Sequence, residues 1–196
     1  MMDGTAPQQL GNVMEAHARR HVTAVPGMIR PAEWAGKPVP PRRWIVEGIL
    51  PWGAVTMLSG DGGLGKSLLT MQLATAAASG RAWLGMETAP VKALGVYCED
   101  DPDELHRRMV DVCSQEGVGL ADLDDNLTLI SRVGHGNEFL ARNKYGKPTG
   151  PSEFYNQVRR TANETGAQLV ILDGLHDLFD GNENSRPEAR QFINLL

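Results

Sequence analysis

The sequence has little of what secreted and membrane-spanning proteins require. It contains two cysteines, Cys98 and Cys113, which are too few for a disulfide framework and lack the spacing of a metal site. Its longest stretch without a charged residue, Ser67–Gly80, has fourteen residues and includes Ser, Thr and Gln, so it is too short and too polar to cross a bilayer. The N-terminus has neither the basic start nor the apolar run of a secretory signal. We therefore expect a cytoplasmic protein with no membrane partner.

A general excess of basic residues is also missing. The formal net charge is −5 at pH 7, so a contact with nucleic acid would need a local basic patch. Residues 1–43 carry six Lys or Arg and three Asp or Glu, whereas residues 44–196 carry thirteen and twenty-one. The 41% hydrophobic content of this 196-residue chain is enough for one well-buried domain. The acidic portion is predicted to be the folded portion.

The character of the sequence changes near residue 44. Residues 1–43 show no sustained apolar period and contain several prolines, which predicts a flexible N-terminal arm or linker with at most one short helix around residues 13–21. Residues 44–196 alternate apolar runs with amphipathic segments, a rhythm typical of parallel strands joined by crossover helices. The predicted fold class is therefore α/β, with a mostly parallel sheet flanked by helices.

Strands and helices can be assigned to most of this second segment. Apolar runs predict strands at residues 53–59, 93–98, 127–133 and 168–173, the first of them buried. Helices are predicted at residues 66–79, from residue 102 onward, at residues 152–164 and after Pro187. Asp101 provides an N-cap for the helix that starts at residue 102. The residues predicted to face inward are Leu105, Met109, Val112 and Cys113 in that helix, and Phe154, Val158 and Ala162 in the next.

A phosphate-binding motif lies between the first predicted strand and the helix after it. Its residues match the pattern G-x-x-x-x-G-K-[ST] and are Gly60, Asp61, Gly62, Gly63, Leu64, Gly65, Lys66 and Ser67. In this pattern the backbone turns several N–H groups toward one anion, and the helix that follows adds its positive dipole end. Lys66 would reach the β- and γ-phosphates, and the Ser67 hydroxyl would ligate Mg²⁺. We predict that these residues, with Leu68, bind ATP; a glycine-rich turn with an exposed lysine is the alternative.

The second feature is an apolar strand that ends in a carboxylate. Residues 169–173 read LVILD, and an aspartate at this place in P-loop enzymes holds Mg²⁺ beside the Ser or Thr ligand. A buried strand that ends in Asp before the turn-forming Gly174 is the alternative. Because the phosphate-binding motif precedes this strand in the chain, we predict Asp173 as the second protein residue of the metal site.

The residue that activates water must come from elsewhere, because Asp173 is followed by Gly174 rather than by a glutamate. Glu99 follows the predicted strand 93–98, and neighbouring parallel strands present their carboxyl ends at one edge of a sheet. We predict Glu99 as the catalytic base, with a helix-dipole charge as the alternative. Of its two acidic neighbours, Asp101 is assigned to the helix cap and Asp100 to a solvated charge.

Three blocks of the sequence resemble a known family. They are WIVEGILPWGAVTMLSGDGGLGKSLLTMQLA, GVYCEDDPDELHRRM and LVILDGLHDLFDG, and they resemble RecA-fold AAA-type ATPases related to the RepA hexameric replicative helicases of plasmids. The resemblance covers residues 44–196. It implies ATP and Mg²⁺ as ligands, Glu99 as the hydrolytic base, DNA as a partner, and a homo-oligomer, a hexamer, as the assembly. Members of that family continue with further strands and an arginine that reaches the neighbouring subunit's nucleotide. We therefore expect a RecA-like P-loop core that is incomplete at its C-terminus and exposes an apolar edge near residues 168–172.

Two functions remain open at this point. The first is ATP hydrolysis coupled to single-stranded DNA in replication or repair, and the second is a nucleotide-gated binding or regulatory module without turnover. The basic loop 142–147, which includes Tyr145, suits backbone phosphates and base stacking, although such charges are usually only solvated. His176 and Asp177 are assigned to a polar loop, and the pair Arg107 and Arg108 to the exposed face of a helix.

Overall fold

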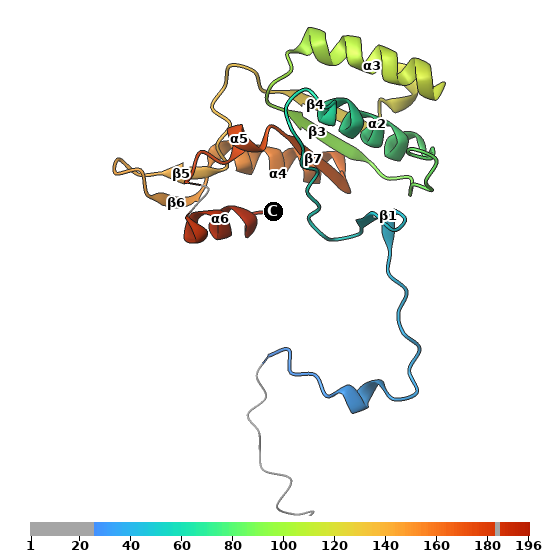
Figure 1. Ribbon diagram of the computed structural model, residues 1–196, viewed down its shortest axis with the longest axis vertical. Coiled ribbons are helices and arrows are strands. Elements are labelled where there is room, and N and C mark those ends of the chain that lie inside the picture. Colours follow the sequence, from blue (N-terminus) through green and yellow to red (C-terminus); the bar gives the residue numbers. More distant parts are fainter. Residues whose placement is uncertain (1–25, 183–184) are drawn as a thin grey trace, which may run out of the picture. The chain divides into compact units, whose positions relative to one another are not determined.

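The computed structural model describes residues 26–182 and 185–196, and the chain divides into two compact units, residues 1–41 and 42–196. In the first unit the described residues are all exposed and form one short 3-10 helix, η1 (Pro31–Trp34) (Figure 1). The helix predicted around residues 13–21 lies outside the described residues. The second unit holds the sheet and every predicted site residue.

The second unit is built on a three-stranded parallel sheet with the order β4-β3-β7. Its strands are β3 (Ala93–Tyr97), β4 (Leu127–Ser131) and β7 (Leu169–Asp173), which lie within the predicted ranges. Tyr97 at the end of β3 pairs with Ser131 on one side and with Asp173 on the other. All of β3 is buried, as expected for a parallel strand covered on both faces. The core therefore has the parallel α/β arrangement that the sequence predicts.

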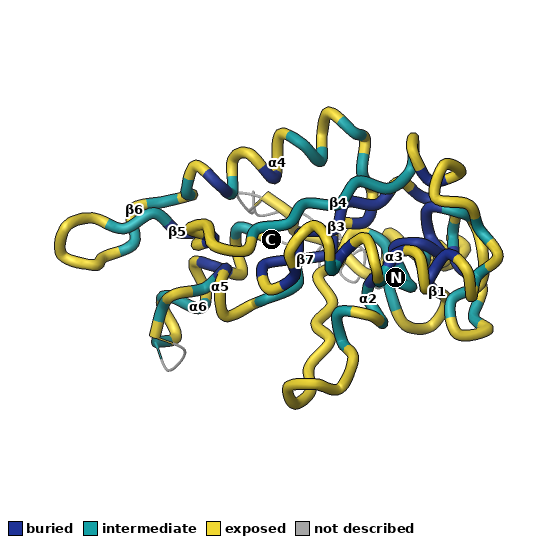
Figure 2. The backbone as a smooth tube through the Cα atoms, turned by 90° about the horizontal axis from the view of Figure 1, so that it is seen from above, coloured by how far each residue is buried: buried dark blue, intermediate teal, exposed yellow. Residues whose placement is uncertain are grey.

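Helices cover both faces of this sheet, and the buried residues concentrate between the layers (Figure 1 and Figure 2). The helices are α2 (Lys66–Ser79), α3 (Pro102–Glu116), α4 (Glu153–Thr165), α5 (Leu175–Leu178) and α6 (Arg186–Ile193). Tyr97 is buried in a core with residues of α2 and α3. Leu94 and Val96 enter a separate core with residues of α4, α5 and α6. Side chains of one strand reach two cores because they alternate between its faces.

The predicted helix boundaries and inward faces are largely correct. α2 spans the predicted residues 66–79. The Asp101 carboxylate accepts a hydrogen bond from the Glu104 N–H at 2.7 Å, so the predicted N-cap of α3 is confirmed. The predicted inward residues Leu105, Met109, Val112, Cys113, Phe154 and Val158 are buried, and Ala162 is partly buried. The short helix α5 occupies the place of the polar loop predicted at His176 and Asp177.

The strand predicted at residues 53–59 is wrong. These residues are exposed and belong to none of the described strands. Apolar and β-branched side chains favour a strand, but a strand also needs a neighbour that pairs with its backbone groups. Among the described residues none pairs with 53–59, and the side chains of Val55, Met57 and Leu58 remain exposed.

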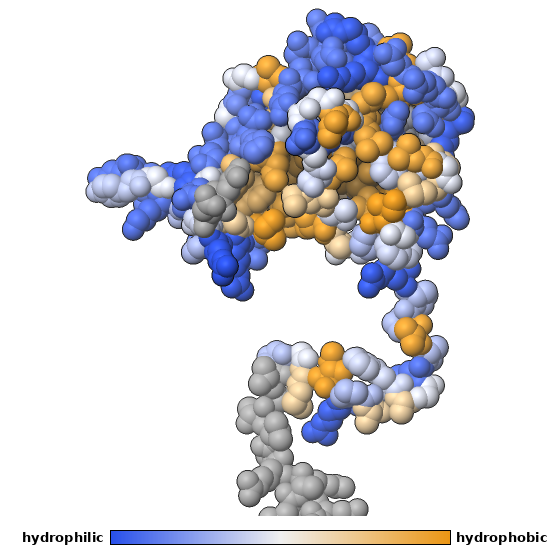
Figure 3. Space-filling model, viewed as in Figure 1, coloured by the Kyte–Doolittle hydropathy of each residue, from blue (hydrophilic) through white to orange (hydrophobic). Residues whose placement is uncertain are grey.

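Within the described residues, strand β7 is an edge of the three-stranded sheet, because its strand neighbour is β3 alone. Leu169 and Ile171 are buried in a core with residues of α2, whereas the side chain of Val170 is 41% exposed. Figure 3 shows that apolar residues gather on one face of the second unit. The structure therefore has the predicted edge near residues 168–172, with Val170 as its exposed apolar side chain.

The second unit also contains two antiparallel hairpins that the sequence analysis does not predict. β1 (Trp44–Val46) pairs with β2 (Leu50–Pro51), and β5 (Leu140–Arg142) pairs with β6 (Pro148–Pro151). The second hairpin encloses the basic loop 142–147 and extends away from the rest of the second unit (Figure 1). A 3-10 turn, η2 (Leu120–Leu123), precedes β4. Within the described ranges, no helix combines the length and the apolar character needed to cross a membrane.

Candidate functional site

The predicted phosphate-binding loop connects residues 53–59 to helix α2. Gly65 is the N-cap of this helix and has a left-handed backbone with a φ of 79°. Glycine adopts this conformation without strain, so the loop can turn directly into the helix. Residues 60–65 are exposed. The loop therefore presents its backbone to solvent at the N-terminus of a fourteen-residue helix, where an anion is favoured.

Lys66 and Ser67 are the first two residues of α2. The Lys66 ammonium group donates hydrogen bonds to the carbonyl oxygens of Gly60 and Asp61, both at 2.8 Å, and so closes the loop onto the helix. Ser67 is half-buried at the start of the helix, and Leu68 next to it is exposed. The loop thus has an ammonium group and a hydroxyl in the order that phosphate and metal binding require.

Asp173 and Glu99 come from two neighbouring strands. Asp173 ends β7 opposite Tyr97 of β3, and Glu99 follows Tyr97 by two residues. The Cys98 N–H donates a hydrogen bond to the Asp173 carbonyl oxygen at 3.1 Å, which ties the two strand ends together. Helix α2, which starts at the phosphate-binding loop, contacts both strands. The predicted site residues therefore lie on adjacent elements at the carboxyl edge of the sheet, the usual ligand-binding edge of such folds.

Gly174 shows why no glutamate follows Asp173. Its φ is 98°, and a Cβ atom added to it would lie 2.8 Å from the Cβ atom of Cys98 and 3.0 Å from a carboxylate oxygen of Asp177. A side chain at this position would force the close-packed ends of β3 and β7 apart. The structure therefore has no room for a carboxylate side chain directly after Asp173.

The three consecutive acidic residues after β3 lie in different surroundings. Glu99 is exposed, and within the described residues its side chain has no hydrogen-bond or ion-pair partner. Asp101 caps α3. Asp100 is only 9% exposed, so its prediction as a solvated charge is wrong. The turn from β3 into α3 carries Asp100 back beneath that helix, where Arg108 neutralises it.

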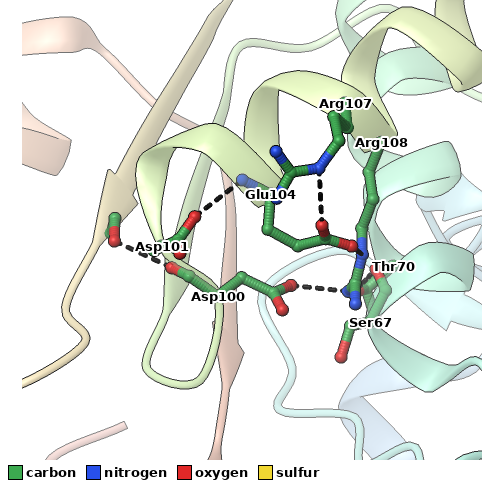
Figure 4. A network of polar contacts seen from close by, with 8 residues as sticks. Ser67, Thr70, Asp100, Asp101, Glu104, Arg107 and Arg108 are labelled. Atoms are coloured by element: carbon green, nitrogen blue, oxygen red, sulfur yellow. Dashed lines mark hydrogen bonds and ion pairs between the residues drawn. The ribbon is translucent and has the colours of Figure 1, made fainter.

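Arg108 connects helix α3 to the end of β3 (Figure 4). Its Nη1 atom lies 2.6 Å from Asp100 Oδ2, and its Nε atom lies 2.8 Å from Glu104 Oε1. Its side chain is 31% exposed, whereas that of Arg107, which also pairs with Glu104, is 65% exposed. The prediction of an exposed pair is therefore correct for Arg107 and wrong for Arg108. Helical periodicity alone does not reveal that Arg108 pairs with Asp100, which follows β3.

Burial changes the acid–base properties of the residues behind the site. It raises the pKa of Tyr97 above its ordinary value and raises the pKa of Cys98 to about 12. Burial also raises the pKa of Asp100, while the charge of Arg108 lowers it. Tyr97 and Cys98 are therefore neutral near pH 7 and are poor acceptors for a proton from water. Glu99 and Asp177 are exposed carboxylates near this end of β3, and the charges of both raise the pKa of Cys98 further.

A metal ion at this site would depend on the nucleotide. Within the described residues, no three His, Cys, Asp or Glu gather into a metal site. Mg²⁺ usually keeps several waters and binds one or two protein groups together with substrate phosphates. Ser67 and the half-buried Asp173 fit this mode, since one supplies a hydroxyl at the start of α2 and the other a carboxylate at the end of β7.

The basic loop of the β5–β6 hairpin is only partly solvated. The Arg142 guanidinium lies 2.8 Å from Asp180 Oδ1 and 3.0 Å from Glu188 Oε2, so its interpretation as a solvated charge is wrong. Tyr145 is 75% exposed, and the Lys144 Nζ atom lies 4.9 Å from the centre of its ring. The loop therefore presents an aromatic ring and a neighbouring ammonium group to solvent, while Arg142 ties the hairpin to the C-terminal residues.

One protein-family model matches most of the chain. Its description is AAA domain, and it covers residues 23–196. A search of curated proteins finds no match. The parallel sheet flanked by helices, with a phosphate-binding loop at the start of α2, fits the α/β P-loop core that this description implies.

Proposed function

This chain belongs to the AAA domain family, and we propose that it binds ATP with Mg²⁺ and hydrolyses it. Residues 60–65 and Lys66 hold the phosphates, while Ser67 and Asp173 hold the metal ion. When bound, Mg²⁺ neutralises charge on the β- and γ-phosphates. Glu99 accepts a proton from the attacking water, which makes the water oxygen a better nucleophile. That oxygen bonds to the γ-phosphorus while the bond to the bridging oxygen breaks, and ADP and phosphate are released.

The register of β3 and β7 is the observation that carries this proposal. In this register Tyr97 of β3 pairs with Asp173 of β7. Glu99, two residues after Tyr97, therefore lies near the end of the strand that carries Asp173. The position after Asp173 has no room for a side chain, because a Cβ atom there would meet Cys98 at 2.8 Å. The exposed Glu99 is thus a carboxylate free to meet a water molecule, just beyond the strand that pairs with Asp173.

Phosphate release from ATP and Mg²⁺ by the purified chain tests the proposal. Glu99→Gln removes the base but keeps the size of the side chain, so kcat should fall about 100-fold or more while the nucleotide still binds. Asp103→Asn is the matched control, because Asp103 is an exposed carboxylate in the nearby first turn of α3. Lys66→Ala should weaken nucleotide binding. Normal turnover by Glu99→Gln would place the base elsewhere and overturn the assignment.

We further infer that turnover is coupled to single-stranded DNA in replication or repair, as in a helicase. The resemblance to RepA hexameric helicases supports this partner and a homo-hexameric assembly. The exposed Tyr145 beside Lys144 adds a ring for base stacking and a charge for a backbone phosphate.

Binding of a labelled DNA single strand tests this coupling. Loss of the ring in Tyr145→Ala should weaken binding about tenfold, as expected for one stacked base. Arg160→Ala is the control, because it removes an exposed charge from α4 instead. If wild type and Tyr145→Ala bind DNA equally well, the β5–β6 hairpin does not contact the DNA. Sedimentation velocity with nucleotide and DNA tests for the hexamer.

A nucleotide-gated regulatory module without turnover is the second candidate function. It is favoured by residues 53–59, which lead into the phosphate-binding loop but are exposed and unpaired. Catalysis requires the phosphates to be held in a fixed place, and no strand supports this side of the loop within the described residues. Tight ATP binding without phosphate release, with or without DNA, would select this function. Steady turnover that Lys66→Ala abolishes would exclude it.

A further inference from the structure

We propose that Arg108 is a positioning residue for ATP hydrolysis, which acts through its ion pair with Asp100 on the junction that carries Glu99. The β3–α3 junction is residues 98–101, between the end of β3 and the start of α3. This inference rests on the proposed function, because the position of Glu99 matters to the rate only where Glu99 acts on water. In this scheme Arg108 acts through Asp100, and Glu99 is the base.

Glu99 depends on its neighbours for its place. Its side chain is exposed and, within the described part of the chain, forms neither a hydrogen bond nor an ion pair. On one side, the Cys98 N–H donates to the Asp173 carbonyl oxygen at 3.1 Å, which fixes the end of β3 to β7. On the other side, the backbone continues into Asp100. Whatever holds Asp100 therefore also limits where Glu99 can lie.

Asp100 is held from two directions. Its carboxylate lies 2.6 Å from Nη1 of Arg108, and its carbonyl oxygen accepts a hydrogen bond from the Ser131 hydroxyl at 2.8 Å. The Nε atom of Arg108 is bound to Glu104 at 2.8 Å, so the planar guanidinium is fixed on α3 while it reaches the junction. The junction is thus tied to α3 through Arg108 and to β4 through Ser131.

Removal of Arg108 would leave a buried carboxylate without its charge partner. An unpaired buried charge is strongly unfavourable, so the Asp100 carboxylate would turn toward water or take up a proton. Either response loosens the backbone next to Glu99. A misplacement of about 1 Å in a catalytic arrangement can lower a rate by about 100-fold. Loss of the ion pair should therefore lower turnover strongly, although neither of its residues is the base.

The same ion pair lies beside the helix of the phosphate-binding loop. Helices α2 and α3 contact each other, and Figure 4 draws Ser67 and Thr70 of α2 in one close-up with Arg108. Thr70, Asp100 and Arg108 all lie near enough to the buried Tyr97 to influence its pKa. Arg108 thus occupies the place where the α2 side and the Glu99 side of the site meet, and its pair with Asp100 helps to set their separation.

A comparison of Arg108→Ala with Arg107→Ala separates this role from a general effect of charge. Both changes remove a guanidinium from α3 and a contact with Glu104, but only Arg108 reaches Asp100. Arg108→Ala should lower kcat by about tenfold or more, with KM and the affinity for a non-hydrolysable ATP analogue changed by less than about threefold. Arg107→Ala should keep kcat within about twofold, since it breaks an exposed pair.

Two further variants keep the test decisive if Arg108→Ala folds poorly. Arg108→Lys restores a positive charge opposite Asp100 but not the planar two-point contact, so it should recover part of kcat. Asp100→Asn should lower kcat, and its combination with Arg108→Ala should be no slower than the slower single variant, because both break one pair. Thermal unfolding of each variant distinguishes a lost rate from a lost fold.

Hydrogen–deuterium exchange in residues 97–103 adds a readout other than rate. Exchange there should be faster in Arg108→Ala than in wild type, and unchanged in Arg107→Ala. If Arg108→Ala has the kcat and the exchange rates of the wild type, the positioning role is wrong. Loss of turnover in Glu99→Gln would still support hydrolysis in that case. Absence of turnover in the wild-type chain would overturn hydrolysis itself, and with it any positioning role in hydrolysis.

Discussion

The two sides of the candidate site are built differently. The phosphate side begins with residues 53–59, which are exposed and unpaired, and continues through a loop whose residues are also exposed. The carboxylate side consists of the ends of β3 and β7, which are hydrogen-bonded to each other. There Asp100 is buried and paired with Arg108. We call the exposed phosphate side the open half of the site and the bonded carboxylate side the fixed half.

This difference shows what holds each half in place. The carboxylate half is ordered by the sheet, an ion pair and the cap of α3. The open half is held together by Lys66, whose ammonium group donates hydrogen bonds to two carbonyl oxygens of its own loop. Phosphate oxygens can replace those carbonyls as acceptors. Nucleotide is therefore expected to order the open half and to leave the fixed half almost unchanged.

The largest effect should come from nucleotide on the open half. A non-hydrolysable ATP analogue with Mg²⁺, at one hundred times its Kd, should raise the free energy of unfolding by about 2.7 kcal/mol. Lys66→Ala should lose most of this gain at the same concentrations, because the phosphates lose their ammonium partner. Urea unfolding with and without the analogue measures the gain. An equal gain in Lys66→Ala would mean that the nucleotide binds away from the loop.

A change in the fixed half should be costly even without a ligand. Gly174→Ala combines a φ of 98° with a Cβ atom 2.8 Å from that of Cys98, so it should lower the free energy of unfolding by about 2 kcal/mol or more. Gly62→Ala is the control in the open half, where an added Cβ atom meets nothing within 4 Å. It should change stability by less than about 0.5 kcal/mol. Similar losses in urea unfolding for the two variants would contradict the comparison.

The cap of α3 should contribute a smaller part of the order in the fixed half. Asp101→Ala removes the acceptor for the Glu104 N–H and should cost about 1 kcal/mol in the free energy of unfolding. Asp103→Ala removes a charge from the same turn but no capping bond, so its cost should be clearly smaller. Urea unfolding of both variants measures these losses in the free energy of unfolding. Equal losses would mean that the helix dipole, not the capping bond, accounts for the effect.

The exposed edge of β7 should affect association more than stability. Val170→Lys places a charge at the 41% exposed position and should change the free energy of unfolding by less than about 0.5 kcal/mol. It should reduce concentration-dependent self-association, because charged side chains protect sheet edges. Light scattering over a dilution series tests this, with Val110→Lys on the exposed face of α3 as the control. A matching reduction in the control would show that net charge, not the edge, is responsible.

The features predicted correctly are those that a short stretch of sequence encodes. The bounds of α2, the N-cap at Asp101 and the buried face of α3 each follow from residues within a few turns of one helix. The apolar runs of β3, β4 and β7 were likewise recognisable from their own residues. Local propensity and periodicity were enough in these places because the interactions that decide them are local.

The errors lie where a distant partner decides the outcome. Residues 53–59 have the composition of a strand, but pairing requires a second strand at the right place. The sequence analysis predicts a solvated charge at Asp100, yet its side chain pairs with Arg108, eight residues away on α3. Arg142 was assigned to a solvated loop, although its partners Asp180 and Glu188 come from the C-terminal part of the chain.

By itself the sequence determined the parallel α/β core, the phosphate-binding motif and the residue types available for metal and water, because these are written in local order and spacing. Only the tertiary structure decided that β3 lies directly beside β7, that Gly174 must lack a side chain, and that Arg108 holds Asp100 next to Glu99. The first two outcomes depend on contacts between residues far apart in the chain, and the third on the way α3 packs against the junction before it. Such contacts exist only once the strands and helices have packed.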